Sequence, residues 1–293
     1  MALRTVSTAV FLTSIVLALY MQRASSSEVN VSQTQPPISD QYLLEFVLNL
    51  EYLSAEFFSC GANGRGLDAT APQLTKGGPP PVGGRKANLN PFFQDIFSQF
   101  TLIKIGHLRA INGVVKGFPI PLLNISKELF GKIVDDALGQ TLRPSFDPYA
   151  NSLNYLLGAY IISDLAPPGY VGITPQLQNV AVIRAYLYER RNYPVQPYGV
   201  NVSELTDRIS ELANRLGKEG TKSEGIVVPL SQGAEGRIEG NVIGADNDSL
   251  AYGKMPGELL RIVYGTSDEH VPGDFYPKGA NGRIARSFLS RGT

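Results

Sequence analysis

The sequence predicts an all-α fold, a helical bundle followed by a long irregular C-terminal tail. Between residues 40 and 217, apolar residues recur at spacings of three and four, the pattern of helices that bury one face. From residue 218 to residue 293, glycine and short apolar pieces replace that pattern. The 293-residue chain is 43% hydrophobic and 18% charged, so it can bury a core, which argues against a disordered protectant.

The first helix follows a polar segment, residues 27–39, that we interpret as a flexible lead-in. Ser39 or Asp40 can cap its start. Its apolar face is formed by Leu44, Val47, Leu48, Glu51, Ala55 and Phe58. We expect its other faces to carry Glu45, Asn49, Tyr52 and Glu56. Residues 61–90 are rich in glycine and proline, so we expect an irregular loop there that packs over the surface or covers a site.

The second helix is predicted over residues 91–116, with a proline in its first turn. Its apolar stripe consists of Phe93, Phe97, Phe100, Lys104, His107, Ile111 and Val114. A shorter amphipathic helix is predicted over residues 127–138. The stripe includes a lysine and a histidine, and both become candidates for a functional site.

Two further long helices are predicted over residues 149–165 and 175–191, each stopped by prolines that follow it. A fifth helix begins at a capping box formed by Asn201 and Glu204, and Gly217 is expected to be the first residue after its end. These helices complete a bundle domain over residues 40–217.

The C-terminal extension, residues 218–293, is expected to wrap around the bundle. It carries one more helical segment over residues 257–264. The predicted helix over residues 175–191 ends in a charged group, which we expect to be solvated. This group consists of Arg184, Glu189, Arg190 and Arg191.

The N-terminus has the pattern of a secretory signal peptide, residues 1–26. Arg4 precedes an apolar run from Val6 to Leu19, and small residues follow from Ala24. The alternative is a membrane anchor, but the run is shorter than the roughly 20 residues that span a bilayer. We therefore expect a secreted protein of the extracellular (cell wall) space or of the vacuole, with no transmembrane segment after cleavage.

Glycosylation sequons at Asn30, Asn124, Asn201 and Asn247 are compatible with passage through the secretory pathway. Cys60 is the only cysteine, so the chain has no internal disulfide and must be stabilised by packing.

The sequence does not indicate a binding partner. Nucleic acid is not expected as a partner, because Lys+Arg and Asp+Glu are both 26.

Glu51 is the first candidate site residue, because an acid within an apolar stripe is costly unless it is paired or bound to a metal. Helical bundles build di-iron and di-manganese sites from inward glutamates and Glu-x-x-His motifs. His107 fits that plan, but Lys104 stands where the motif needs glutamate, and an ammonium group cannot ligate a metal. On the fourth helix the expected ligand positions hold Gln176 and Asn179, whose amides are weak ligands.

Two interpretations of this group remain open. In one, Glu51 and His107 hold a single metal, completed by water or by loop carboxylates. In the other, which we favour, Lys104 takes the place of the metal cation and neutralises Glu51, with His107 hydrogen-bonded nearby. A separate cluster, residues 268–270 (Asp-Glu-His), could also bind a metal, but a solvated loop is the better interpretation.

Several segments together resemble the desiccation-related proteins of plants, which carry a ferritin-like domain. The matching segments are residues 43–46, 50–53, 77–81, 106–111, 146–154, 187–190, 206–210 and 275–280. The resemblance implies a ferritin-like helical bundle, a signal peptide and a link to water deficit. It does not imply a particular biochemical activity.

This chain differs from the family in three places that bear on a metal site. The family usually has glutamate at Lys104 and at Gln176, and Gln-Asp at Asn179 and Val180. The stretch between residues 172 and 181 is also shorter than in relatives. We therefore predict a protective water-stress protein with a degenerate metal site, no cofactor and no catalysis of its own. The alternative is an iron- or manganese-binding ferritin-like protein or oxidoreductase that uses Glu51 and His107.

Overall fold

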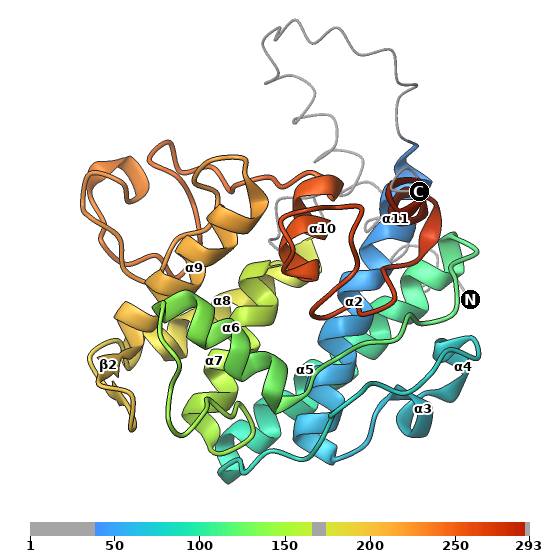
Figure 1. Ribbon diagram of the computed structural model, residues 1–293, viewed down its shortest axis with the longest axis horizontal. Coiled ribbons are helices and arrows are strands. Elements are labelled where there is room, and N and C mark those ends of the chain that lie inside the picture. The colour runs from blue at the N-terminus through green and yellow to red at the C-terminus, as the bar shows by residue number, and fades with distance from the viewer. Residues whose placement is uncertain (1–38, 166–173, 291–293) are drawn as a thin grey trace, which may run out of the picture.

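The computed structural model describes residues 39–165 and 174–290, and it describes the side chains within these ranges except at residues 164, 165 and 174–178 (Figure 1). The predicted signal peptide, nearly all of the predicted lead-in and the Asn30 sequon lie outside the described residues. The described chain is mainly helical, as predicted. No helix in these ranges is both long and apolar enough to span a bilayer.

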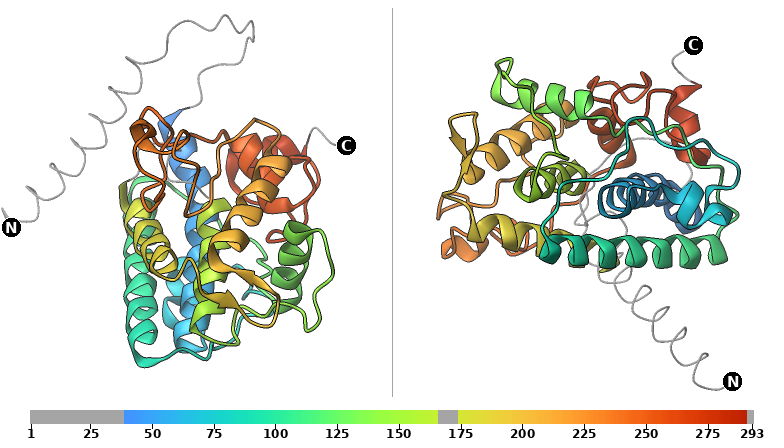
Figure 2. Two further views of the ribbon diagram at one scale, coloured as in Figure 1. Left: turned by 90° about the vertical axis from the view of Figure 1, so that its left-hand side faces the viewer. Right: turned by 90° about the horizontal axis from the view of Figure 1, so that it is seen from below.

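Four helices form the central bundle: α2 (Asp40–Asn63), α5 (Pro91–Val114), α7 (Ser152–Leu165) and α8 (Thr174–Glu189). Helix α2 packs against α5 and α7, and α7 packs against α8. The ring of Tyr186 on α8 packs against Phe93 on α5, with the ring centres 5.5 Å apart. Figures 1 and 2 show α5 and α2 running side by side.

Helix α2 begins after Ser39, whose hydroxyl accepts a hydrogen bond from the Gln41 amide, and it ends at Gly64 in the left-handed conformation (φ 70°). Every residue from Phe46 to Ala62 is buried. Asn49, Tyr52 and Glu56, which the pattern places off the apolar face, are therefore buried as well. Helices α5, α7 and α11 (Gly282–Leu289) surround α2, so it has no solvent face along most of its length.

An aromatic cluster joins α2, α5 and α7. The ring of Tyr155 on α7 stacks on Phe57 of α2, with ring centres 4.6 Å apart, and meets the ring of Phe97 on α5 edge-on at 4.6 Å. The Tyr155 hydroxyl donates to the Phe57 carbonyl at 2.6 Å, which satisfies its polar end in the core. These contacts fix how the three helices approach one another.

The glycine- and proline-rich segment after α2 is not wholly irregular. It contains two short helices, α3 (Leu67–Thr70) and α4 (Pro72–Thr75). Its later part pairs with the chain before α6, since Val82 forms a parallel bridge with Asn124. The segment was predicted as loop because one helical turn gives no periodic pattern to recognise.

The remaining helix boundaries differ from the predictions by a few residues. Helix α5 ends at Val114, which is 58% exposed although we placed it in the buried stripe. Helix α6 (Lys127–Leu138) has the predicted bounds. Helix α7 starts at Ser152 rather than at 149, because the Asn151 side chain accepts a hydrogen bond from the Asn154 amide at 2.9 Å and so caps the helix.

A short antiparallel hairpin, β1 (Pro194–Val195) and β2 (Val200–Asn201), leads into α9 (Val202–Gly217). The Asn201 side chain accepts from the Glu204 amide at 2.8 Å, as the capping pattern predicts. Gly217, however, is the last helical residue, and Lys218 takes the left-handed conformation (φ 61°) that we expected of Gly217. Helix α9 packs on α6 and also contacts α7 and α8.

The C-terminal extension contains a single-turn helix, η1 (Ala234–Gly236), and the helices α10 (Pro256–Tyr264) and α11. Helix α10 matches the predicted segment, whereas α11 was not predicted. Helix α11 packs on α2 and α10 contacts α9. Asn49 of α2 exchanges two hydrogen bonds with the backbone of Asn281, at 2.9 and 2.8 Å, and so ties the extension to the central helix.

Arg184 was predicted to belong to a solvated helix end, and this was wrong. It is 3% exposed, and its guanidinium donates to the carbonyls of Glu224, Gly225 and Asn241. It also donates to the Tyr160 hydroxyl at 3.3 Å. Arg184 lies five residues before the end of α8, far enough inside for its side chain to reach the core and hold the extension.

Candidate functional site

Glu51 lies at the centre of the candidate site, in the middle of α2. It is 1% exposed. Its Oε1 lies 3.2 Å from the Nζ of Lys104, and its Oε2 lies 3.3 Å from the Nδ1 of His107. The structure therefore brings together the three residues that the sequence singled out on the first two long helices.

The positions of these residues follow from the packing of α2 against α5. Lys104 and His107 are three residues apart on α5, so they lie on one face of that helix, one above the other. Lys104 is almost fully enclosed, with 4% of its side chain exposed, whereas His107 has 19% of its side chain exposed. The ammonium group is thus held in the core, and the imidazole lies nearer the surface.

The electrostatics of the group depend on this burial. A carboxylate removed from water is stabilised by an opposite charge that is also shielded from water, because the effective dielectric constant there is low. Both oxygens of Glu51 have a nitrogen partner. Lys104 supplies a positive charge next to Glu51.

The described residues of this site do not fit a two-metal centre. Such a centre needs several carboxylates and two histidines that project inward from the bundle helices. Here Glu51 and His107 are the donors, and Lys104 has no lone pair while it is charged. Its positive charge also disfavours a second cation at the same place.

Two amide residues of the fourth helix were the remaining candidates. The side chain of Gln176 lies outside the described residues. Asn179 is 2% exposed, and neither its Oδ1 nor its Nδ2 has a hydrogen-bond partner among the described residues. It is therefore not bonded to Glu51, Lys104 or His107.

Glu56 is a buried acid that lies off the apolar stripe of α2 predicted from the sequence. It is 0% exposed; its Oε2 accepts from the Leu67 amide at 3.0 Å, and its Oε1 has no hydrogen-bond partner among the described residues. Burial raises the pKa of Glu56 to about 7; the hydrogen bond from Leu67 opposes this rise and the charge of Asp68 adds to it. No periodic signal in the sequence marks this burial, because Glu56 lies off the apolar stripe.

The pH dependence of stability should weaken when Glu56 is replaced by glutamine. The pKa of Glu56 rises from 4.5 to about 7 on folding, so the folded state holds this proton more tightly than the unfolded state does. The contribution of Glu56 to the free energy of unfolding is therefore largest below about pH 4.5, and it falls by about 3 kcal/mol as the pH rises from about 4.5 to about 7. Thermal unfolding at pH 5.5 and pH 8.5 measures about 2 kcal/mol of this loss, because the rest has already occurred at pH 5.5.

The matched control for that experiment is Glu211→Gln, because Glu211 lies on the surface with 47% of its side chain exposed. We expect Glu56→Gln to reduce the difference between the two pH values and Glu211→Gln to leave it unchanged. Equal pH dependence in the wild type and in Glu56→Gln would contradict the assignment.

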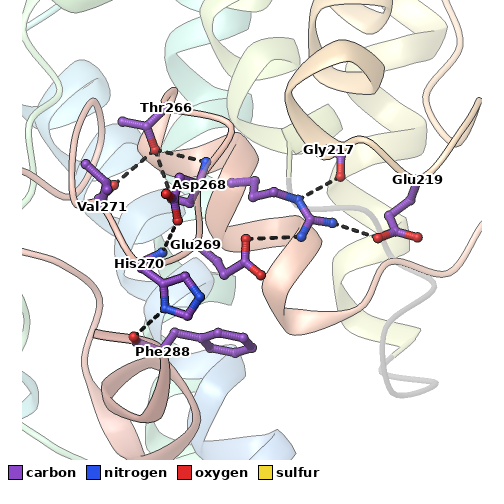
Figure 3. Close-up of polar contacts among 9 residues, drawn as sticks. Gly217, Glu219, Thr266, Asp268, Glu269, His270, Val271 and Phe288 are labelled. Carbon is purple, nitrogen blue, oxygen red and sulfur yellow. Dashed lines mark hydrogen bonds and ion pairs between the residues drawn. The ribbon is translucent and has the colours of Figure 1, made fainter. Parts of the chain in front are cut away.

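The second predicted cluster joins the end of α10 to α11 (Figure 3). Ligand atoms of Asp268, Glu269 and His270 lie within 4.8 Å of one another. The carboxylate of Glu269 pairs with Arg261 at 3.1 Å, and Asp268 accepts from the His270 amide at 2.9 Å. His270 Nδ1 contacts the Phe288 carbonyl at 2.6 Å. These partners give the cluster a structural role that connects the two helices.

A surface cleft of about 550 Å³ lies between the start of α6 and the β1–β2 hairpin. Its floor includes Asp147, Asn154 and Tyr198. Asp147 pairs with Arg85, and Asn154 donates to the Asp147 carbonyl at 3.0 Å. Asp147 and Asn154 are thus used in local contacts, and neither histidine of the chain is among the residues that line the cleft.

Three of the predicted sequons lie in the described residues. Asn201 and Asn247 are exposed, and Asn124 is half-buried.

Cys60 is buried in the last turns of α2, and burial raises the pKa of its thiol to about 12. Gly84 crosses directly over it, since a Cβ at that position would lie 2.7 Å from Cys60 Sγ.

Comparison with known proteins gives consistent matches. A family model described as a ferritin-like domain matches residues 39–187. The chain is 48% identical over 268 residues to the ferritin-like catalase Nec2 of Nesocodon mauritianus, covering 86% of each chain. It is 46% identical over 264 residues to the desiccation-related protein PCC13-62 of Craterostigma plantagineum, covering 84% of each chain. No solved structure matches it significantly.

Proposed function

Because the chain belongs to the ferritin-like domain family, we propose that it is a secreted desiccation-related protein whose metal site has been replaced by an ion pair. In this proposal the protein has no catalysis of its own and acts through its folded surface. The observation that carries it is the 3.2 Å contact between Lys104 Nζ and Glu51 Oε1 in the core.

Several facts support the protective part of the proposal. A relative that is 46% identical is named a desiccation-related protein. The N-terminal sequence has the pattern of a signal peptide, and the sequons at Asn201 and Asn247 lie on exposed positions. The proposal predicts that the purified protein preserves the activity of a labile enzyme through drying and rehydration better than an equal mass of serum albumin does.

The metal part of the proposal is tested by metal content. The wild type, expressed in cells supplied with iron and manganese and purified without chelators, should contain well under one metal per chain. Lys104→Glu should raise the metal content, because it replaces the ammonium with a carboxylate three residues before His107. Lys104→Met is the control, since it removes the charge without adding a ligand. About two metals per wild-type chain would contradict the proposal.

A second candidate function is suggested by the other relative, which is named a catalase. Peroxide disproportionation converts two molecules of hydrogen peroxide into two of water and one of oxygen. Glu51 and His107 would be the protein's metal donors, and a bound iron or manganese would supply the redox chemistry. Oxygen release from hydrogen peroxide by the wild type, lost in His107→Ala, would favour this candidate over the protective one.

A further inference from the structure

Helix α5 presents a continuous exposed face along its whole length. Figure 2 shows α5 at one edge of the molecule, with no other described helix over its outer side. Exposed positions recur at spacings of three and four at Phe92, Asp95, Gln99, Leu102, Gly106, Arg109 and Gly113. Pro91, Ala110 and Val114 beside them are exposed as well. The spacing of three and four is the seven-residue repeat along which a helix contacts a partner helix.

The middle of this face carries an exposed apolar side chain. Leu102 is 69% exposed, and Phe92 near the start of the helix is 52% exposed. Gly106 and Gly113, which follow Leu102 on the face, have no atom within 4 Å of the position that a Cβ would take. A large apolar side chain followed by small residues on an open helix face lets a second helix approach closely.

The charges on this face are arranged symmetrically about Leu102. Asp95 lies seven residues before it and Arg109 lies seven residues after it, and seven residues are about two turns. Asp95 accepts a hydrogen bond from Gln99 of the same helix at 2.8 Å. Within the described chain, neither Asp95 nor Arg109 belongs to an ion pair, although both are exposed on the same face.

We propose that this face binds a second copy of the same chain, with the two α5 helices antiparallel and crossing at Leu102. In a two-fold arrangement each residue before the centre faces the residue equally far beyond it in the partner. Asp95 of each copy then faces Arg109 of the other copy, so the contact contains two symmetry-related ion pairs. Phe92 lies ten residues before the centre, so it comes next to the partner's Gly113, which lies eleven residues beyond the centre and has no side chain to clash.

The arrangement suits a second copy better than an unrelated partner. A face with an acid at one end and a base at the other is complementary to itself when it is turned through 180°. An unrelated partner would gain no advantage from the equal spacing of the two charges around Leu102. The face is also separate from the Lys104–Glu51 pair, which lies on the buried side of the helix.

Sedimentation velocity of the purified protein over a range of concentrations tests this proposal. The wild type should dimerise. Leu102→Glu should be monomeric, because it places two carboxylates at the centre of the contact. Arg109→Glu should weaken dimerisation at least about tenfold, since both ion pairs become repulsive. The double variant Asp95→Arg with Arg109→Glu should restore it, because the pairs are re-formed with their signs exchanged.

The matched control is Leu250→Glu, because Leu250 is 63% exposed on the C-terminal extension and lies away from α5. It should dimerise as the wild type does. Circular dichroism confirms that each variant is folded. A monomeric wild type, a dimer that persists in Leu102→Glu, or a double variant that is no better than Arg109→Glu would each overturn the proposal. None of these outcomes depends on whether the protein is protective or catalytic.

Discussion

Lys104→Met should destabilise the protein by about 3–5 kcal/mol, which is the cost of leaving one member of a buried ion pair without its partner. Glu51 is 1% exposed, and its Oε1 would lose the ammonium group that lies 3.2 Å away. His107 contacts the other oxygen and cannot replace that charge fully from its more exposed position. For a chain of this length the melting temperature should fall by roughly 10 °C.

A double variant distinguishes the stability lost with the charge from the stability lost with the side-chain packing. The double variant Lys104→Met with Glu51→Gln removes both charges and should recover much of the lost stability, because no uncompensated charge remains in the core. Lys132→Met is the surface control. Lys132 also contacts acids, but 52% of its side chain is exposed, so the expected loss is below about 1 kcal/mol. A Lys104→Met variant as stable as the wild type would show that Glu51 does not need this charge.

Arg184→Ala should have the next largest effect, about 3–5 kcal/mol, and should act mainly on the C-terminal extension. Arg184 donates to the carbonyls of Glu224 and Gly225 at 3.0 and 2.7 Å, and to that of Asn241 at 2.7 Å. Alanine would leave these carbonyls with fewer donors in a buried region. Arg184→Lys should rescue only part of the loss, because an ammonium lacks the planar fork of the guanidinium.

Hydrogen exchange measured by mass spectrometry localises this effect. In Arg184→Ala, amides of residues 223–241 should exchange faster, whereas those of α2 and α5 should keep most of their protection. Arg208→Ala is the control, because Arg208 lies on α9 with 49% of its side chain exposed and pairs only with Glu211 among the described residues. Uniform loss of protection along the chain would mean instead that Arg184 supports the whole bundle.

The helices could be predicted where their pattern is long. Helices α2, α5, α6 and α9 have clear caps and apolar residues at helical spacing, so their existence and most of their bounds follow from the sequence. The surroundings of α2 could not be predicted this way, because an amphipathic pattern assumes a helix with one solvent face. Burial of Asn49 depends on Asn281, which is 232 residues away, and no local pattern reports such a partner.

The candidate site shows the same division. Glu51, Lys104 and His107 could be singled out because each is a charged or titratable residue within an apolar stripe, and two of them share one face of a helix. The burial of Glu56 and Arg184 could not be foreseen. The Leu67 amide that binds Glu56 belongs to a helix of a single turn. The carbonyls that surround Arg184 belong to an irregular segment. Neither feature leaves a periodic signal in the sequence.

The position of Cys60 has a consequence for a protein that is concentrated as water is lost. Thiols on the surface of crowded molecules join chains covalently in an oxidising compartment, because the thiolate is the reactive form. Here burial raises the pKa of the Cys60 thiol to about 12, and Gly84 closes the approach to its sulfur. We therefore expect that drying and dissolving the protein produces no disulfide cross-links between molecules, so that any association between copies stays reversible.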